Sequence, residues 1–265
     1  MISTDRKPLR ELLDFYMEAG ADALVGEAPV DRFAAEAAPA PPPPRPSFTE
    51  PRMPAAAPPA AAPAAPDAAA MEARTAARGA ATLAELRAIL EGFEGCALKA
   101  TATRLVFADG NPEARIMLVG EAPGRDEDIE GLPFVGRSGK LLDLMLKAIG
   151  LDRTGVYIAN IVPWRPPGNR TPTPQESAIC LPFILRQIEL ADPDILVCLG
   201  GPSAQTLLGV KDGITKVRGR WFTFDTGKRE IKAMATFHPA FLLRSPLQKR
   251  FAWRDFLAIK KALNG

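Results

Sequence analysis

The chain has 265 residues, of which 47% are hydrophobic and 24% charged, and its formal net charge is +2. No apolar run approaches the roughly 20 residues that span a bilayer, and the N-terminus lacks the apolar centre of a signal peptide, so we expect a cytoplasmic protein without membrane segments. The three cysteines, Cys96, Cys180 and Cys198, are too few and too scattered for a disulfide framework, which favours reduced thiols.

The charge is distributed unevenly along the chain. Residues 1–78 hold 8 basic and 11 acidic side chains, whereas the last 38 residues, from Lys228, hold 9 basic and 2 acidic ones. A basic end on a nearly neutral protein indicates a face that contacts phosphates, although a solvated helix face gives the same pattern.

Residues 1–36 are predicted to contain a short amphipathic helix. In "DRKPLRELLDFYME", residues 5–18, the apolar side chains recur near helical spacing. Residues 37–78 are rich in Ala and Pro, so we predict a disordered linker that acts as a spacer, with a ligand for a proline-binding domain as the alternative. Two roles are open for the helix: it packs on the main domain, or it docks on a protein partner.

Residues 79–265 are predicted to form one α/β domain, beginning with a helix over 82–93 that Thr82 caps, with Glu85 three residues on. Apolar strands are then expected at 115–121, 156–162, 194–200 and 232–239, and helices at 138–150, 173–190 and 202–209. This alternation predicts a three-layer α/β/α sandwich with a short central, mainly parallel four-stranded sheet. Ligands bind such sheets at the carboxyl ends of the strands.

The loop after the first strand carries the clearest sign of a site. It is a long stretch without periodicity, "GEAPGRDEDIEGLPFVGRSG", which carries Glu121, Asp126, Glu127 and Asp128 close to Phe134, an aromatic that we expect to be exposed. Four carboxylates are unsuited to a phosphate cradle, and neither GxGxxG nor a P-loop lysine is present, which argues against nucleotide binding. The pentapeptide VGEAP also occurs at 25–29, but no strand is predicted before it, so that copy is interpreted as coincidence.

Three stretches, "GEAPGRDEDIEGLPFVGRSGKLL", "YIANIVPWRPPGNRTPTPQE" and "TFHPAFLLR", resemble the signature motifs of the family 4 uracil-DNA glycosylases. The resemblance runs from about Gly95 to Leu263 and leaves out the N-terminal helix and linker. It implies a monofunctional DNA-repair enzyme that flips uracil out of DNA and hydrolyses its N-glycosidic bond with water, leaving an abasic site. The expected partner is uracil-containing DNA, double- or single-stranded, bound by a monomer.

By the same resemblance, the base pocket is formed by Gly120, Ala122, Glu127, Phe134 and Asn160. Phe134 would stack on the uracil, with a core phenylalanine that anchors the loop as the alternative. Glu127 would exclude the methyl group of thymine. The Asn160 amide would read uracil N3–H and O4, because it offers one donor and one acceptor, whereas cytosine presents the wrong pair.

Three residues are implied to serve the reaction itself. Glu121 would lie beside the sugar, where it either orients the attacking water or offsets positive charge at C1'. Asn169 is a weaker candidate for the same water. His238, the only histidine in the chain, would donate a hydrogen bond to uracil O2 as negative charge develops there.

The stretch "PAFLLRSPLQKR" resembles the family's DNA-intercalating loop. Leu243 or Leu247 would fill the space left by the flipped base. Phosphate contacts are expected from Arg244, Lys249 and Arg250, with Arg218 and Arg220 as additions.

Members of the family carry a 4Fe-4S cluster on four cysteines, and here the chain departs from the pattern. Phe93 and Trp164 stand at two of the ligand positions, only Cys96 and Cys180 remain, and Cys198 lies in a predicted strand. Because each of the four irons needs a ligand, we expect no cluster and no metal, with the two aromatic side chains packed in its place.

This departure also supports a rival hypothesis, that the chain is a catalytically weak relative which binds uracil-containing or damaged DNA without excision. Retention of every expected pocket residue argues against it. Relatives that capture DNA covalently carry an inserted basic loop with a histidine after the first motif, and "PFVGRSGKLL" has neither. Bases beyond uracil stay open as substrates.

Overall fold

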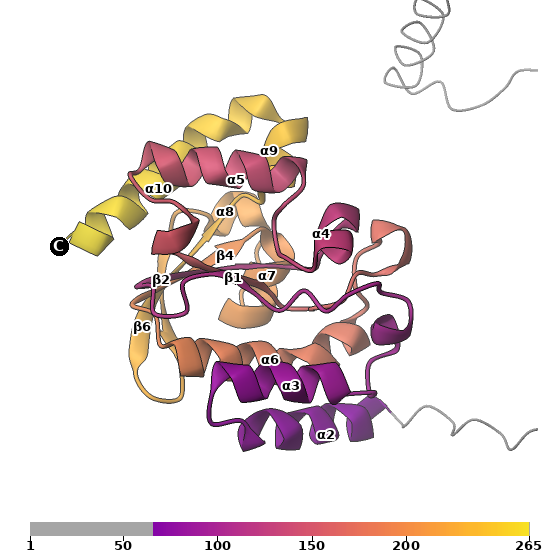
Figure 1. Ribbon diagram of the computed structural model, residues 1–265. Helices are drawn as coiled ribbons and strands as arrows, with labels where there is room; N and C mark the ends of the chain where they lie inside the picture. Colours follow the sequence, from indigo (N-terminus) through magenta and orange to yellow (C-terminus); the bar gives the residue numbers. More distant parts are fainter. Residues whose placement is uncertain (1–65, 265) are drawn as a thin grey trace, which may run out of the picture. The chain divides into compact units, whose positions relative to one another are not determined.

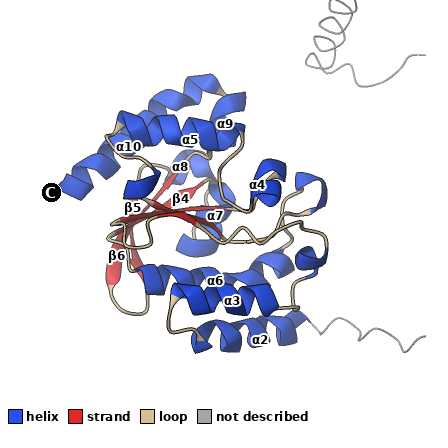
Figure 2. Ribbon diagram, in the orientation of Figure 1, coloured by secondary structure: helices blue, strands red, loops and turns tan. Residues whose placement is uncertain are grey.

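The computed structural model describes residues 66–264, so the predicted N-terminal helix and most of the predicted linker lie outside the described residues. The strands are β1 (Asp109–Gly110), β2 (Ile116–Gly120), β3 (Tyr157–Asn160), β4 (Ile195–Leu199), β5 (Trp221–Asp225) and β6 (Glu230–Thr236). They form one sheet in the order β1-β3-β2-β4-β6-β5. Figures 1 and 2 show helices on both sides of this sheet, which confirms the predicted α/β/α sandwich.

The helices cover the sheet in two layers. The α-helices are α2 (Pro66–Gly79), α3 (Leu83–Gly92), α4 (Arg125–Glu130), α5 (Arg137–Ala148), α6 (Pro174–Ala191), α7 (Gly201–Leu208), α8 (Ile214–Val217), α9 (Pro239–Arg244) and α10 (Lys249–Asn264). The short 3-10 helices are η1 (Ala97–Ala100), η2 (Arg153–Gly155), η3 (Pro167–Asn169) and η4 (Pro246–Gln248). In Figure 1, α2, α3 and α6 lie on one side of the sheet and α5 and α10 on the other. Between residues 66 and 264 no helix combines the length and apolar character needed to cross a membrane.

The four central strands, β3, β2, β4 and β6, run parallel to one another. Every residue of β2 and β4 is buried, as expected for parallel strands with helices on both faces. In β2, Met117 and Val119 belong to the core beneath α6, whereas Ile116 and Leu118 belong to the core beneath α5 and α10. Alternate side chains therefore supply two separate cores.

The prediction of four strands missed both edges of the sheet. The two-residue strand β1 pairs antiparallel with β3, and β5 pairs antiparallel with β6 at the opposite edge. Two residues are too few to show a pattern, and β5 is mostly exposed or half-buried. Neither segment therefore has the buried apolar run by which the central strands are recognised.

Helix α2 corrects the last part of the predicted linker, because residues 66–78 are helical. Ala69, Ala73 and Ala77 recur every four residues, are buried, and face α3 and α6. Alanine has the highest helix propensity, and a proline at the start of a helix loses no hydrogen bond. The Ala-rich residues for which a spacer is predicted thus form a helix, in which the small alanine side chains pack closely against α3 and α6. The remaining division into residues 1–36, a linker and a catalytic domain stays a prediction.

The predicted Thr82 cap is confirmed, and a second threonine caps another helix. Thr82 caps α3, its Oγ1 accepting from Glu85 N at 3.2 Å. Thr173 caps α6 in the same way, and Glu176 returns a hydrogen bond to Thr173 N at 2.7 Å. These reciprocal bonds satisfy backbone N–H groups that a helix start leaves unpaired.

Candidate active site

A cavity of about 630 Å³ opens at the carboxyl ends of the parallel strands. It lies where β2 leads into Glu121, β3 ends at Asn160, and β6 leads into His238. The predicted site residues that line it are Glu121, Ala122, Glu127, Phe134, Asn160, Asn169, His238 and Arg244. Side chains from four separated stretches of sequence are thus brought together at the edge of the sheet where ligands bind.

Asn160 carries a buried side-chain oxygen with no hydrogen-bond partner among residues 66–264. The side chain is 5% exposed at the end of β3. Gly120, its neighbour on β2, makes room for it: a Cβ there would lie 2.4 Å from Asn160 Oδ1 and 2.8 Å from Phe134 Cζ. An unpaired buried acceptor costs about 1–3 kcal/mol, and this atom can accept a hydrogen bond from a donor that enters the cavity.

Phe134 is 4% exposed, so the expectation of an exposed aromatic is wrong. Its ring packs against the imidazole of His238, with centroids 5.4 Å apart and planes inclined by 32°. The side chain belongs to the core that α5 covers, and it also lines the cavity. The Phe134 ring is therefore part of the hydrophobic core and also part of the cavity wall, so the two alternatives from the sequence are compatible.

Glu127 lies in α4, a six-residue helix within the loop for which no regular structure was expected. Its carboxylate accepts three backbone hydrogen bonds: from Gly124 N to Oε2 at 3.1 Å, and from Val135 N and Gly136 N to Oε1 at 3.1 and 3.0 Å. The loop is therefore tied together on both sides of Phe134. Because Glu127 is only 7% exposed and lines the cavity, it forms a fixed wall.

Glu121 and Asn169, the two candidates for handling water, differ in their surroundings. Burial raises the pKa of the half-buried Glu121 carboxyl. A carboxylate that has lost part of its hydration binds a remaining water more strongly. Asn169 is exposed on η3 with φ 56°, and its Oδ1 already accepts from Arg165 Nε at 2.6 Å. The geometry therefore favours Glu121 as the group that holds a water.

His238 has a defined orientation and charge state. As the N-cap of α9 it accepts a hydrogen bond at Nδ1 from Ala240 N at 3.1 Å. Burial, with a smaller contribution from Arg244, lowers the pKa of His238 to about 4. The neutral ring then carries its proton on Nε2, which makes Nε2 a donor.

Gly200 is a cavity residue that sequence reasoning missed. It follows β4 with φ 101°, and a Cβ there would lie 3.1 Å from His238 Cβ. Only glycine adopts this conformation readily and allows the imidazole so close. The signal available in the sequence was a glycine pair directly after an apolar strand.

The segment predicted to contact DNA lies on α9, η4 and the first residues of α10. Leu247 is 83% exposed and Leu243 37%. Lys249 and Arg250 are exposed at the start of α10, and Arg244 lines the cavity. An exposed leucine thus lies in a segment with three cationic side chains, one of which, Arg244, lines the cavity.

Arg218 does not join this basic surface, so its predicted phosphate contact is wrong. Its Nε donates to Asp255 Oδ2 at 2.9 Å, and its Nη2 donates to Asp255 Oδ1 and, at 2.8 Å, to Phe251 O. Asp255 is 1% exposed and also accepts from Thr236 Oγ1 at 2.6 Å. A guanidinium that neutralises a buried carboxylate is not free to bind a phosphate. Arg220 is exposed, as a phosphate contact requires.

The residues at the implied cluster positions do not fit a 4Fe-4S group. Cys96 Sγ and Cys180 Sγ lie 3.9 Å apart, both buried. Phe93 and Trp164, 5% and 2% exposed, belong to the same core as these thiols. The whole chain has three cysteines, and Cys198 is buried in β4, so four thiolate ligands cannot be assembled. In the described part of the chain, no group of three or more His, Cys, Asp or Glu is arranged to hold a metal ion.

Comparisons with known proteins agree with the geometry. Residues 107–257 match the family described as the Uracil DNA glycosylase superfamily. A type-4 uracil-DNA glycosylase of Thermotoga maritima is 48% identical over 151 residues, covering 57% of this chain and 77% of that protein. Its counterpart from Archaeoglobus fulgidus is 43% identical over 168 residues, covering 62% and 84%. That from Sulfurisphaera tokodaii is 42% identical over 171 residues, covering 63% and 78%.

Proposed function

The chain belongs to the uracil-DNA glycosylase superfamily, and we propose that its cavity at the carboxyl ends of the strands is where uracil is excised. The protein is a DNA-repair glycosylase of the hydrolase type that is similar to the type-4 enzymes. It cleaves the bond between uracil N1 and C1' and leaves an abasic site. The main support for excision in this cavity is that it holds both the unpaired Oδ1 of Asn160 and a neutral His238.

Asn160 reads the edge of the flipped base in this proposal. Uracil N3–H donates to the Oδ1 atom that has no partner in the described chain, and the amide nitrogen donates to uracil O4. Cytosine has an acceptor at N3, which would leave Oδ1 unpaired and facing another acceptor. A site built to bind a donor rejects an analogue that lacks it, because its own buried polar groups are then unsatisfied.

Phe134 and Glu127 provide the walls of the base pocket. The Phe134 ring supplies a flat apolar surface, and base stacking on such a ring is worth about 1–3 kcal/mol. Glu127 excludes the methyl group of thymine, and three backbone N–H groups keep its carboxylate from moving aside. Ala122 lines the cavity, and Gly120, which does not line it, leaves room for the side chains of Asn160 and Phe134.

His238 stabilises the leaving group. As the bond between C1' and N1 breaks, its electron pair moves onto uracil, and negative charge gathers at O2. The Nε2–H of the neutral ring donates to O2, and the positive charge of Arg244 lies in the same cavity. Water held by Glu121 bonds through its oxygen to C1' and releases one proton, and the uracil anion takes up a proton from solvent.

The exposed segment after the cavity holds the DNA while the base is out of the stack. Leu247, the more exposed of the two candidate leucines, enters the vacated space in the duplex. Arg244, Lys249 and Arg250 contact phosphates around it.

We also propose that the enzyme works without a 4Fe-4S cluster. Phe93 packs edge-on against Phe183 with centroids 5.0 Å apart, and with Trp164 it supplies apolar contacts beside the two remaining thiols. Iron analysis and absorbance near 400 nm on aerobically purified protein test this. We expect less than one iron per chain; a brown protein with four irons would contradict it.

We propose that the protein acts as a monomer, because one chain supplies the residues that line the cavity. We also propose that it acts on cellular DNA in the cytoplasm. The N-terminal helix predicted within residues 1–36 is proposed to bind a protein partner or the catalytic domain. Light scattering on the full-length protein tests the monomer, and a pull-down comparing it with a chain that starts at Pro66 tests the helix.

The test of function is an oligonucleotide with one uracil, treated with the protein and then with alkali. We expect the strand to break at the uracil position only after alkali, because an abasic site forms but the enzyme does not cut the backbone. An intact strand that still shifts in a gel would support the rival, a protein that binds uracil-containing DNA without excision.

A further inference from the structure

Phe134 is held in a backbone conformation that its side chain disfavours. Its φ is 55°, and the described residues contain only two other non-glycine residues with positive φ, Asn169 and Asp192. Bulky residues seldom adopt this region, and they stay there only where neighbouring groups enforce it. The orientation of the ring in the cavity therefore depends on whatever holds the Phe134 peptide.

The Arg153 side chain makes that contact. Its Nη2 donates to Phe134 O, and its Nη1 donates to Pro133 O at 3.1 Å. The guanidinium is held in turn by two carboxylates: Nε donates to Asp143 Oδ1 at 2.8 Å, and Nη1 pairs with Asp109. Arg153 thus joins η2, β1, α5 and the loop before α5.

Gly139 closes the same arrangement from the side of α5. A Cβ at this position would lie 1.6 Å from Phe134 O, so only glycine allows the carbonyl to point towards the arginine. The Phe134 carbonyl is thereby fixed between the first turns of α5 and the guanidinium.

We propose that Arg153 is a positioning residue for uracil excision, which acts by holding Phe134 so that its ring forms the wall of the base pocket. This inference rests on the proposed function, because it takes the Phe134 ring as the surface on which uracil stacks. The planar fork of arginine donates to two successive carbonyls while it binds two carboxylates. Lysine carries the same charge but has no fixed fork, so it cannot hold both carbonyls in one orientation.

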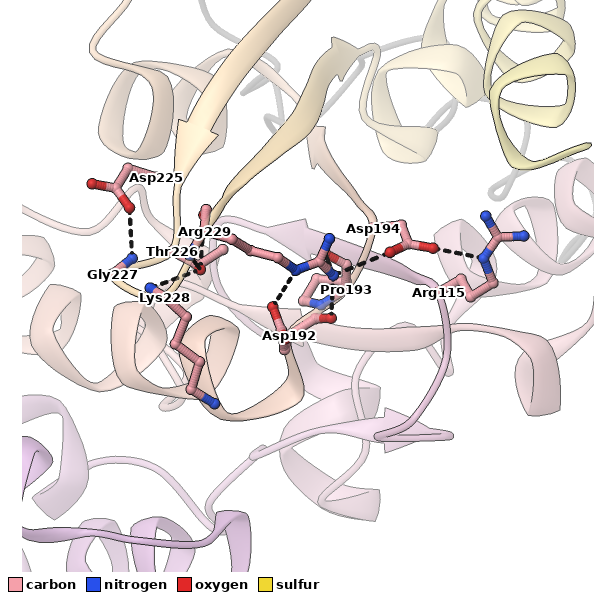
Figure 3. Close-up of polar contacts among 9 residues, drawn as sticks. All are labelled: Arg115, Asp192, Pro193, Asp194, Asp225, Thr226, Gly227, Lys228 and Arg229. Atoms are coloured by element: carbon pink, nitrogen blue, oxygen red, sulfur yellow. Dashed lines mark hydrogen bonds and ion pairs between the residues drawn. The ribbon is translucent and has the colours of Figure 1, made fainter. Parts of the chain in front are cut away.

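Arg229 provides a matched control within the same molecule (Figure 3). Its guanidinium also binds two carboxylates, of Asp192 and Asp194, and two successive carbonyls, Asp192 O and Pro193 O. Asp192, like Phe134, has positive φ. None of these residues lines the cavity. The two arginines therefore make similar contacts, one beside the pocket and one away from it.

The experiment measures single-turnover excision, KM and the dissociation constant of free uracil for the full-length protein and its variants. We expect Arg153→Met to lower the single-turnover rate about tenfold, corresponding to partial loss of base stacking, and to weaken uracil binding. We expect Arg153→Lys to lose more than half of that rate although it keeps the charge. Arg229→Met should keep the wild-type rate and uracil affinity.

A double-variant cycle separates positioning from a general structural effect. If Arg153 acts through the ring, Arg153→Met should change the rate less than about twofold once Phe134 is alanine, since coupled residues are not additive. Additive losses would overturn the proposal, as would a wild-type rate for Arg153→Lys or an equal loss for Arg229→Met. If Arg153→Met does not fold, Arg153→Lys with and without Phe134→Ala decides the question. Failure of the wild type to release uracil would count against the proposed function instead.

Discussion

The two ends of the parallel strands differ in how their polar side chains are paired. At the amino ends, Arg115 pairs with Asp194 at 2.6 Å, and Arg229 pairs with Asp194 at 3.1 Å and with Asp192 at 2.8 Å (Figure 3). Each of these charges has a partner of opposite sign, and pairing with Arg115 and Arg229 lowers the pKa of Asp194. These four charged side chains, Arg115, Asp192, Asp194 and Arg229, therefore neutralise one another at this end of the sheet.

At the carboxyl ends, three polar side chains of the cavity have no ion-pair partner in the described chain, although Glu127 there accepts three backbone hydrogen bonds. Asn160 Oδ1 is buried without a hydrogen bond in the described chain, burial raises the pKa of Glu121, and burial lowers the pKa of His238 to about 4. Each of these features costs folding free energy, and in the proposed function a ligand satisfies each one by supplying a donor, a water or an acceptor. The amino ends therefore carry paired charges, whereas the carboxyl ends carry groups to which the proposed function assigns a substrate.

The largest expected effect follows removal of the unpaired acceptor. We expect Asn160→Ala to lower the single-turnover rate of uracil excision at least about a hundredfold, because the base loses both edge contacts. The free energy of unfolding should not fall by more than about 1 kcal/mol, since no hydrogen bond of the described chain is lost and a buried acceptor without a partner is removed. Denaturant titration beside the kinetic assay checks both. A large loss of stability would mean that Asn160 is structural.

His238 is expected to contribute the next largest effect. His238→Ala should lower the single-turnover rate at least about tenfold, because the developing charge on uracil O2 loses its donor. Binding of DNA that carries an abasic site is the control, and it should be nearly unchanged because that product has no base to contact. An unchanged excision rate would remove His238 from the mechanism.

The charge state of His238 can be measured directly, because it is the only histidine in the chain. Burial lowers its pKa to about 4, so the folded protein keeps the ring neutral where the unfolded chain, with a pKa of about 6.5, is protonated. Stability contributed by the neutral ring is therefore lost as pH falls from about 6.5 towards about 4. We expect an NMR titration of the imidazole to show no protonation above about pH 5. A midpoint near 6.5 would contradict this.

The smallest effect is expected at the amino ends of the strands. Asp194→Asn should lower the free energy of unfolding by about 1 kcal/mol or less, because these ion pairs are partly exposed and screened by solvent. Thermal or urea unfolding at low and high salt measures it, and the excision rate should stay at the wild-type value. A reduced excision rate would contradict this expectation, because it would show that the two ends of the strands are coupled.

Much of the fold could be predicted from local patterns in the sequence. The central strands and the helices α3, α5, α6 and α7 follow from apolar runs, helical spacing and the Thr82 cap. The edge strands β1 and β5 could not be found, because a short or exposed strand has no buried apolar run. Helix α2 could not be predicted because alanine is frequent both in linkers and in closely packed helices, and the prolines lie before the helix or at its first residue.

The sequence indicated which residues to expect at the candidate site, but not how their side chains are buried and paired. Motifs indicated Asn160 and His238, yet nothing local shows that Asn160 Oδ1 is unpaired or that Phe134 is buried. Arg218 was assigned to phosphate because its partner Asp255 lies far away in sequence. Arg153 was overlooked for the same reason. Contacts between distant residues decide whether a charged side chain binds a substrate or holds the protein together.

The most direct test of the account is the release of free uracil, measured by mass spectrometry after the full-length protein acts on an oligonucleotide with one uracil among several thymines. We predict one free uracil for each abasic strand, no release of thymine, and loss of release with Asn160→Ala. A uracil strand that stays intact with wild-type protein bound to it would contradict the central claim, that the cavity at the carboxyl ends of the strands excises uracil.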